Sequence, residues 1–142
     1  MKLDEILQLI SEDSVISEAH ITSESARTPK LHAKYYTIYI AELKVLKSIE
    51  LRMDELKLKA FEYYSHFSSD EVYQARPLHR KPLKSEIEMY VSADPDIIKI
   101  RGDYELQKMK VKTLEDFIKS ISQRSFIIKN MIDWEKYKNA AL

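Results

Sequence analysis

Residues 35–67 read YYTIYIAELKVLKSIELRMDELKLKAFEYYSHF, and this stretch decides the fold class. Alternating steps of four and three residues lead through ten positions, nine of them apolar or aromatic. These positions are Tyr35, Tyr39, Glu42, Leu46, Ile49, Met53, Leu56, Ala60, Tyr63 and Phe67. Such spacing places one apolar stripe along an α-helix that packs on a partner helix. Since proline is tolerated in a first helical turn, Pro29 supports a long helix over residues 30–66.

A second long helix is predicted to begin at the segment Ser92-Ala93-Asp94-Pro95-Asp96, where Asp94 can cap and Pro95 can take the first helical position. From Ile97 to Glu135 the same spacing passes through twelve positions, nine of them apolar or aromatic. These positions are Ile97, Ile100, Tyr104, Gln107, Val111, Leu114, Ile118, Ile121, Ser125, Ile128, Ile132 and Glu135. From Phe117 onward a second apolar row joins the stripe and makes the apolar face wider than one partner helix requires. This row consists of Phe117, Ile127, Met131 and Trp134. The sequence leaves open whether this helix is interrupted near residues 123–125.

The surplus apolar surface predicts self-association, because the elements of one chain do not cover it. The residues expected to carry the assembly are Phe117, Ile118, Ile121, Ile128, Met131, Ile132 and Trp134. The expected organisation is a single helical domain over residues 1–142. Its parts are an acidic N-terminal segment with a short helix (1–29), the long helix (30–66), a basic loop and arm (67–92) and a C-terminal helical assembly region (93–142).

Composition excludes several classes of protein. The chain has 142 residues, 23 basic and 23 acidic side chains, and 44% apolar residues, which is typical of a folded domain of zero net charge. Its longest charge-free stretches have seven residues, whereas a membrane-spanning helix needs about 20. No secretory signal is recognised after Met1. One glycine and no cysteine exclude glycine-rich nucleotide loops, thiol nucleophiles and disulfides. An all-α fold is therefore expected.

Catalytic and metal-binding patterns are not found in the sequence. The four histidines, His20, His32, His66 and His79, are never three or four residues apart, so no helix presents a histidine pair to a metal. Carboxylate pairs occur, but acid–base catalysis needs buried carboxylates, and sequence does not show burial. We expect no metal, no cofactor and no enzymatic activity.

Two basic segments could bind a nucleic acid. Residues 72–84, VYQARPLHRKPLK, carry four cations and no anion: Arg76, Arg80, Lys81 and Lys84. Cations neutralise phosphates and aromatic rings stack on bases, so this segment suits a single strand. A solvated surface loop is the ordinary alternative.

Residues 57–64, KLKAFEYY, place Lys57 and Lys59 within two helical turns of aromatic rings. This segment also fits a single strand, or else packing with two solvated lysines. In an assembly, weak basic patches repeat, and their contacts to one long strand multiply through effective concentration.

Three stretches carry a resemblance to a known family: FEYYS (61–65), KSEIEMYVSADPDIIKI (84–100) and SISQRSFIIKNMIDWEKY (120–137). They resemble the UvsY family of recombination mediators from T4-like bacteriophages. The first stretch resembles the end of the family's first long helix, and the other two resemble two later blocks in order and spacing. The family's DNA-contacting basic pair falls at Leu58 and Ala60, so Lys57 and Lys59 are displaced by one position, about 100° around a helix.

The resemblance implies a helical protein that forms a homo-oligomeric ring of about six or seven copies. It implies binding of single-stranded DNA, contact with a RecA-class phage recombinase and with the phage single-strand-binding protein, and no catalysis. It implies action in the cytoplasm of the infected bacterial host, without a membrane partner. The expected DNA-binding residues are Lys57, Lys59, Arg76, Arg80, Lys81 and Lys84.

Two other functions stay open at this point. The two helical stripes and the zero net charge also fit a coiled-coil assembly or adaptor protein that does not bind nucleic acids. A helical-bundle enzyme would need a buried polar cluster, and few polar residues interrupt the stripes.

Overall fold

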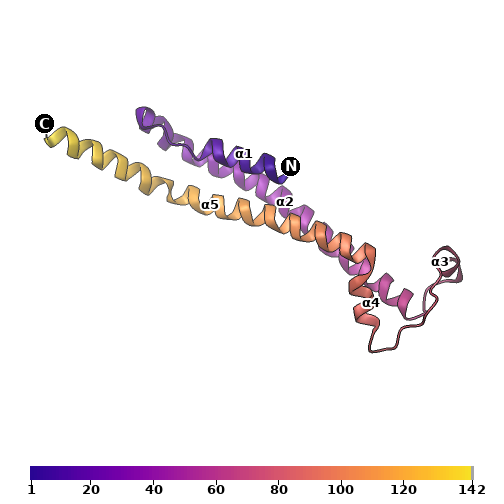
Figure 1. Cartoon of the computed structure of the whole chain (residues 1–142). Helices are drawn as coiled ribbons and strands as arrows, with labels where there is room; N and C mark the ends of the chain where they lie inside the picture. The colour runs from indigo at the N-terminus through magenta and orange to yellow at the C-terminus, as the bar shows by residue number, and fades with distance from the viewer. Residues whose placement is uncertain (142) are drawn as a thin grey trace. The chain divides into compact units, whose positions relative to one another are not determined.

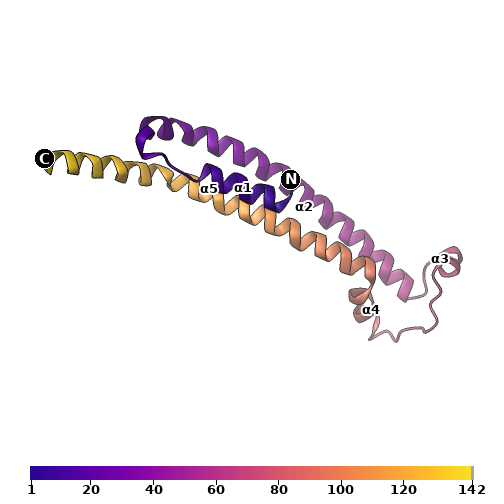
Figure 2. The same cartoon turned by 45° about the horizontal axis from the view of Figure 1, so that its top comes forward.

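The computed structural model describes residues 1–141, and all regular elements in that range are helical (Figures 1 and 2). The elements are α1 (Leu3–Asp13), a 3-10 turn (Glu18–His20), α2 (Ile21–Tyr64), α3 (Asp70–Ala75), α4 (Ile87–Ala93) and α5 (Pro95–Ala141). The predicted all-α class is confirmed. None of these helices is both long enough and apolar enough to cross a membrane.

The residues divide into two compact units. The first comprises residues 1–43 and the chain from residue 109 onward, and the second comprises residues 44–108. The long helices α2 and α5 each contribute to both units. The single domain expected from the sequence stays a prediction, which a single cooperative unfolding transition would support.

The core of the first unit forms where α1 lies on α2 and α5 (Figures 1 and 2). Its buried side chains are Ile6, Leu31, Tyr35, Leu114, Phe117 and Ile121. The rings of Tyr35 and Phe117 meet edge to face with their centroids 4.6 Å apart. Helix α1 contributes through Ile6, which has no exposed surface. Most of the predicted stripe residues of α2 and α5 are buried or half-buried, as their spacing predicts.

Acidic residues of the N-terminal segment are paired with basic residues of α2. Asp13 accepts hydrogen bonds from Arg27 at 2.5 Å, from Lys34 at 2.6 Å and from the Tyr35 hydroxyl at 2.8 Å. Burial alone would raise the pKa of Asp13, but the hydrogen bonds from Lys34 and Tyr35 outweigh it and hold the pKa below its usual range. The end of α1 is thus fixed to α2 by charge as well as by apolar contact.

Helix α2 begins at Ile21, well before the predicted start at residue 30, and Pro29 lies inside it. The reason is a contact that local sequence does not show. Arg124 of α5 donates to the carboxylate and the main-chain carbonyl of Glu24, and to Thr28 Oγ1 at 3.0 Å. These contacts hold the first turns of α2 against α5.

The same arginine changes the register of the α5 stripe. The predicted stripe runs from Ile121 to Ser125 and Ile128, but Arg124 is buried and Ser125 is exposed. Helix α5 is continuous through residues 123–125, so the break that stayed open is not formed. Buried positions therefore follow the spacing 121, 124 and 128, which still keeps them on one helical face.

Candidate nucleic-acid interface

The C-terminus of α2 ends in a left-handed turn. His66 has a φ of 62°, and its N–H donates to the carbonyl of Tyr63 at 3.2 Å. The N–H of Phe67 donates to the carbonyl of Glu62 at 2.9 Å, which completes a Schellman motif. Because the helix stops before Phe67, the placement of this residue on the packing stripe is wrong, and its side chain is 77% exposed.

Helix α3 covers this helix end with Tyr73. The Tyr73 hydroxyl donates to the carbonyl of Tyr63 at 2.7 Å and accepts from the Ser68 N–H at 3.3 Å. Its ring stacks with the rings of Tyr63 and His66, with centroids 5.4 and 5.3 Å away. The segment expected as a loop thus contains a short helix that is packed on the end of α2.

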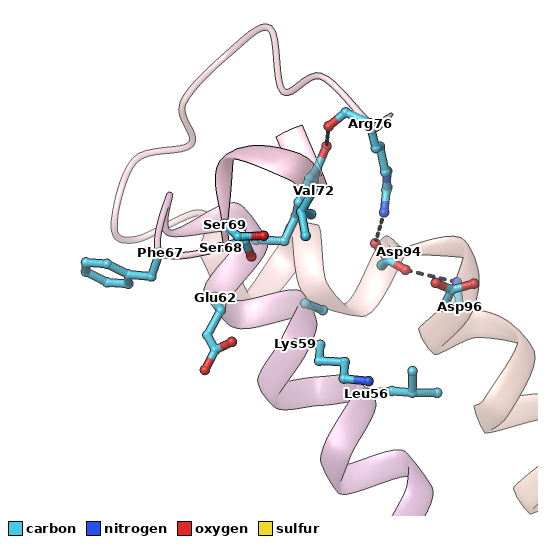
Figure 3. Close-up of a pocket in the computed structure, with 12 residues that line it drawn as sticks. Leu56, Lys59, Glu62, Phe67, Ser68, Ser69, Val72, Arg76, Asp94 and Asp96 are labelled. Atoms are coloured by element: carbon cyan, nitrogen blue, oxygen red, sulfur yellow. Dashed lines mark hydrogen bonds and ion pairs between the residues drawn. The ribbon is translucent and has the colours of Figure 1, made fainter. Parts of the chain in front are cut away.

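Arg76 is held in a network at the N-terminus of α5 (Figure 3). It donates to Asp94 Oδ2 at 3.0 Å and to the Tyr64 hydroxyl at 3.1 Å, and Tyr64 donates to Asp94 Oδ2 at 2.8 Å. Asp94 Oδ1 accepts from the Asp96 N–H at 2.9 Å, so the predicted capping role of Asp94 is confirmed. Asp94 is only 3% exposed, so its charge depends on this network.

The network keeps Asp94 ionised. Burial works to raise the pKa of the Asp94 carboxyl, but hydrogen bonds from Tyr64 and Arg76 outweigh burial and lower the pKa. Burial and the hydrogen bond to Asp94 raise the pKa of the Tyr64 hydroxyl. Arg76 therefore connects the segment after α3 to the start of α5 through a charged partner.

The lowered pKa of Asp94 predicts a loss of stability in acid. Ionised Asp94 contributes stability above its unfolded-state pKa of about 3.9, and the contribution disappears as the pH falls through the lower folded-state pKa. At neutral pH, Asp94→Asn should lower the free energy of unfolding by about 1–2 kcal/mol. Urea unfolding at several pH values should show the gap between wild type and variant closing as the pH falls below about 4. A gap that stays constant in acid would contradict this assignment.

Three surface grooves of the second unit contain five of the six predicted DNA-binding residues, all except Arg80. The Arg76 groove has a volume of about 520 Å³ (Figure 3). Lys59 and Arg76 line it, but so do Glu62, Asp94 and Asp96. With three carboxylates beside two cations, this groove offers a phosphate little net attraction.

The Lys84 groove combines cations with exposed aromatic rings. It has a volume of about 510 Å³ and is lined by Lys81, Lys84, Phe61 and Phe67, with Glu88 as its one carboxylate. Phe61 is 48% exposed and Phe67 more so. The structure thus brings together two predicted lysines and two exposed aromatic rings in one groove.

The Phe61 groove, of about 680 Å³, contains Lys57. Lys57 and Lys59 therefore line different grooves, as expected for helical residues two apart, about 200° around the axis. Arg80 lines none of these grooves and forms an ion pair with Glu86 at 3.7 Å.

Sequence reasoning missed three cationic or aromatic residues of these grooves: Phe67, Arg101 and Tyr104. Phe67 and Tyr104 were both assigned to packing stripes. The spacing of Arg101 and Tyr104, a cation and a ring three residues apart on one helix, is a signal that could have indicated them. Within residues 1–141, no three His, Cys, Asp or Glu side chains come together as a metal site requires.

The predicted assembly residues divide into two groups. Phe117, Ile121 and Ile128 are buried within the chain itself, and Ile118 packs against the core. The other three, Met131, Ile132 and Trp134, are half-buried or exposed. Further exposed apolar side chains in the C-terminal part of α5 are Phe126, Ile127 and Tyr137.

Comparisons with known proteins place the chain in a family. The profile described as "Recombination, repair and ssDNA binding protein UvsY" matches residues 9–141. No curated protein sequence matches the chain. Three crystal structures of the bacteriophage T4 recombination mediator protein UvsY are similar to it. Lattice type II has a TM-score of 0.87 and 20% identity and covers 98% of both chains.

Lattice type I has a TM-score of 0.84 and 19% identity over 94% of this chain and 98% of that chain. Lattice type IV has a TM-score of 0.80 and 19% identity over 97% and 99%. These structures show the shared fold. Because the family profile matches nearly the whole sequence, the chain belongs to the UvsY family of recombination, repair and ssDNA binding proteins.

Proposed function

We propose that this chain binds single-stranded DNA and acts as a recombination mediator. In this role it helps a RecA-class phage recombinase to replace the single-strand-binding protein on the strand. Family membership supports the general activity. The observation that carries the proposal for this chain is the Lys84 groove, where two lysines lie beside two exposed phenylalanines.

The chemistry of the Lys84 groove suits a single strand. Lys81 and Lys84 can each neutralise a phosphate and release its counterions. Exposed rings at Phe61 and Phe67 can stack on bases, which contributes about 1–3 kcal/mol per base. A duplex keeps the faces of its bases inside the helix, so it can use the lysines but not the rings.

The remaining predicted residues take graded roles in this proposal. Lys57 contacts a phosphate on one side of α2. Lys59 makes a weaker contact on another side, because carboxylates share its groove, and Arg80 contributes from an exposed position. Arg76 acts mainly by positioning, because its guanidinium is bound to Asp94 and lies 4.6 Å from the Tyr63 ring. It holds the segment that carries Lys81 and Lys84.

Assembly supplies the strength that one subunit lacks. We infer a ring of about six or seven copies, closed through the exposed apolar side chains of the C-terminal part of α5, including Trp134. Each copy presents the same grooves, so contacts to one strand multiply through effective concentration. The protein acts as a scaffold without catalysis, in the cytoplasm of the infected host. It favours the recombinase-bound strand by differential affinity.

The double variant Lys81→Ala/Lys84→Ala tests the proposal. It should bind a labelled single-stranded oligonucleotide at least tenfold more weakly. The slope of log K against log salt should become less negative by about 0.7 for each lost phosphate contact. Fluorescence anisotropy at several salt concentrations measures both quantities. Lys44→Ala, at an exposed position of α2 that lines none of the three grooves, is the matched control. Wild-type affinity and slope in the double variant would contradict the assignment.

The mediator role needs its own measurement. A recombinase should assemble faster on a strand coated with single-strand-binding protein when wild-type protein is added, and Lys81→Ala/Lys84→Ala should lose most of this acceleration. If the wild-type protein binds the strand but leaves recombinase assembly unchanged, the chain binds DNA without acting as a mediator.

A further inference from the structure

We propose that the Phe61 groove is a nucleobase-binding site in which Phe61 and Tyr104 hold an unstacked base while Lys57 and Arg101 neutralise the adjoining phosphates. The inference rests on the proposed binding of single-stranded DNA. It adds a second site and two residues of α5, Arg101 and Tyr104, to the Lys84 groove.

The groove has the size and lining that a base requires. Its volume of about 680 Å³ lies in the range of small-molecule sites, about 300–1,000 Å³. It is formed by residues of α2, α4 and α5 that all belong to the second unit. Its apolar lining consists of Met53, Leu58, Phe61, Val91, Ile97 and Tyr104.

Two of these apolar side chains are unusually open to solvent. Leu58 is 59% exposed and Phe61 is about half exposed, whereas Tyr104 is half-buried and so held in place. A base that entered the groove would cover this surface with its own apolar face. Stacking of this kind accepts any base, because each base has a π-face.

The charges of the groove suit a nucleotide better than a free phosphate. Arg101 donates to the carbonyl of Ser92 at 3.1 Å, which restrains its guanidinium at the groove. Lys57 lies in the same lining, together with Glu88 and Glu105. The carboxylates weaken attraction for an isolated anion, but they can accept hydrogen bonds from the amino groups of bases. The two cations then meet the phosphates that flank the base.

Phe61 connects this site to the Lys84 groove, because the same ring lines both. A strand whose base stacks near Phe61 therefore has Lys57 and Arg101 in one adjoining groove and Lys81 and Lys84 in the other. Both grooves can thus act on consecutive parts of one strand, and Tyr104 is the ring that belongs to the Phe61 groove alone.

The test combines a protein variant with a strand that lacks bases. Affinities for a normal single strand and for one with several abasic positions are measured by fluorescence anisotropy. The wild-type protein should bind the abasic strand at least fivefold more weakly. Tyr104→Leu should weaken binding to the normal strand and leave binding to the abasic strand unchanged. Tyr36→Leu, which replaces a half-exposed ring of the first unit, should behave as wild type.

The outcomes separate the inference from the proposed function. If the wild-type protein binds neither strand, the proposed function fails. Suppose that the wild-type protein binds the normal strand, and that loss of bases weakens binding of Tyr104→Leu by the same factor as binding of wild type. The proposed function then stands and the base site is overturned. If Tyr104→Leu does not fold, Arg101→Gln, at an exposed position, serves as the second variant. It should reduce the salt slope and keep the sensitivity to base loss, and an unchanged slope would remove Arg101 from the site.

Discussion

Replacing Arg124 with methionine should lower the free energy of unfolding by about 3 kcal/mol, since it breaks a buried ion pair. Arg124 is 5% exposed and donates to the Glu24 carboxylate, to the Glu24 carbonyl at 3.0 Å and to Thr28 Oγ1. Without it, the poorly exposed Glu24 carboxylate retains its ion pair with Arg27, at 3.5 Å. The long side chain of methionine fills part of the space, so the loss reports mainly on the charged contacts.

Thermal unfolding followed by circular dichroism measures this effect. A loss of about 3 kcal/mol in a chain of this size should lower Tm by about 10 °C. Lys129→Met is the matched control, because Lys129 is exposed on the same helix, and it should change Tm little. Equal Tm values for the two variants would show that the Arg124 contacts do not hold α2 to α5.

The second large effect concerns assembly. The double variant Phe126→Glu/Trp134→Glu should dissociate the proposed ring, because it places two charges among exposed apolar side chains of α5. Phe126 is 70% and Trp134 is 58% exposed, and the Trp134 ring stacks with that of Tyr137. With assembly lost, affinity for a long strand should fall by about 100-fold or more, since the contacts no longer add on one molecule.

Native mass determination together with anisotropy distinguishes assembly from direct DNA contact. The variant should have the mass of one or a few chains, and its affinity for an oligonucleotide that fits one subunit should stay near that of wild type. Ser125→Glu adds a charge at an exposed polar position of the same helix. This variant should keep the wild-type mass and the wild-type affinity. An unchanged mass for Phe126→Glu/Trp134→Glu would place the assembly surface elsewhere.

The helical class could be predicted because spacing is a local property. Stripes starting at Tyr35 and Ile97 needed only the order of apolar residues, and the start of α5 needed only Asp94 and Pro95. The shift of the α5 stripe to Arg124 could not be predicted in this way. Its partner, Glu24, is 100 residues away, and an arginine in a stripe is recognised only when its anion is known.

The candidate site was predicted only in part, for a related reason. Lys81 and Lys84 stand out in a segment without carboxylates, and the structure places both in one groove. The exposure of Phe67 could not be predicted, because it depends on the left-handed turn at His66. Sequence indicates such a turn mainly where glycine or asparagine is present. The sequence does not distinguish Arg76 from its basic neighbours, whereas its long-range partners Asp94 and Tyr64 do.

The proposed function requires cations and exposed aromatic rings of the second unit to bind a strand whose bases are unpaired. The most direct measurement compares the affinity of the assembled wild-type protein for a labelled single strand and for the duplex of the same sequence, at moderate salt. We expect clearly tighter binding of the single strand. Equal affinity for the two, or no binding of the single strand even at low salt, would contradict it.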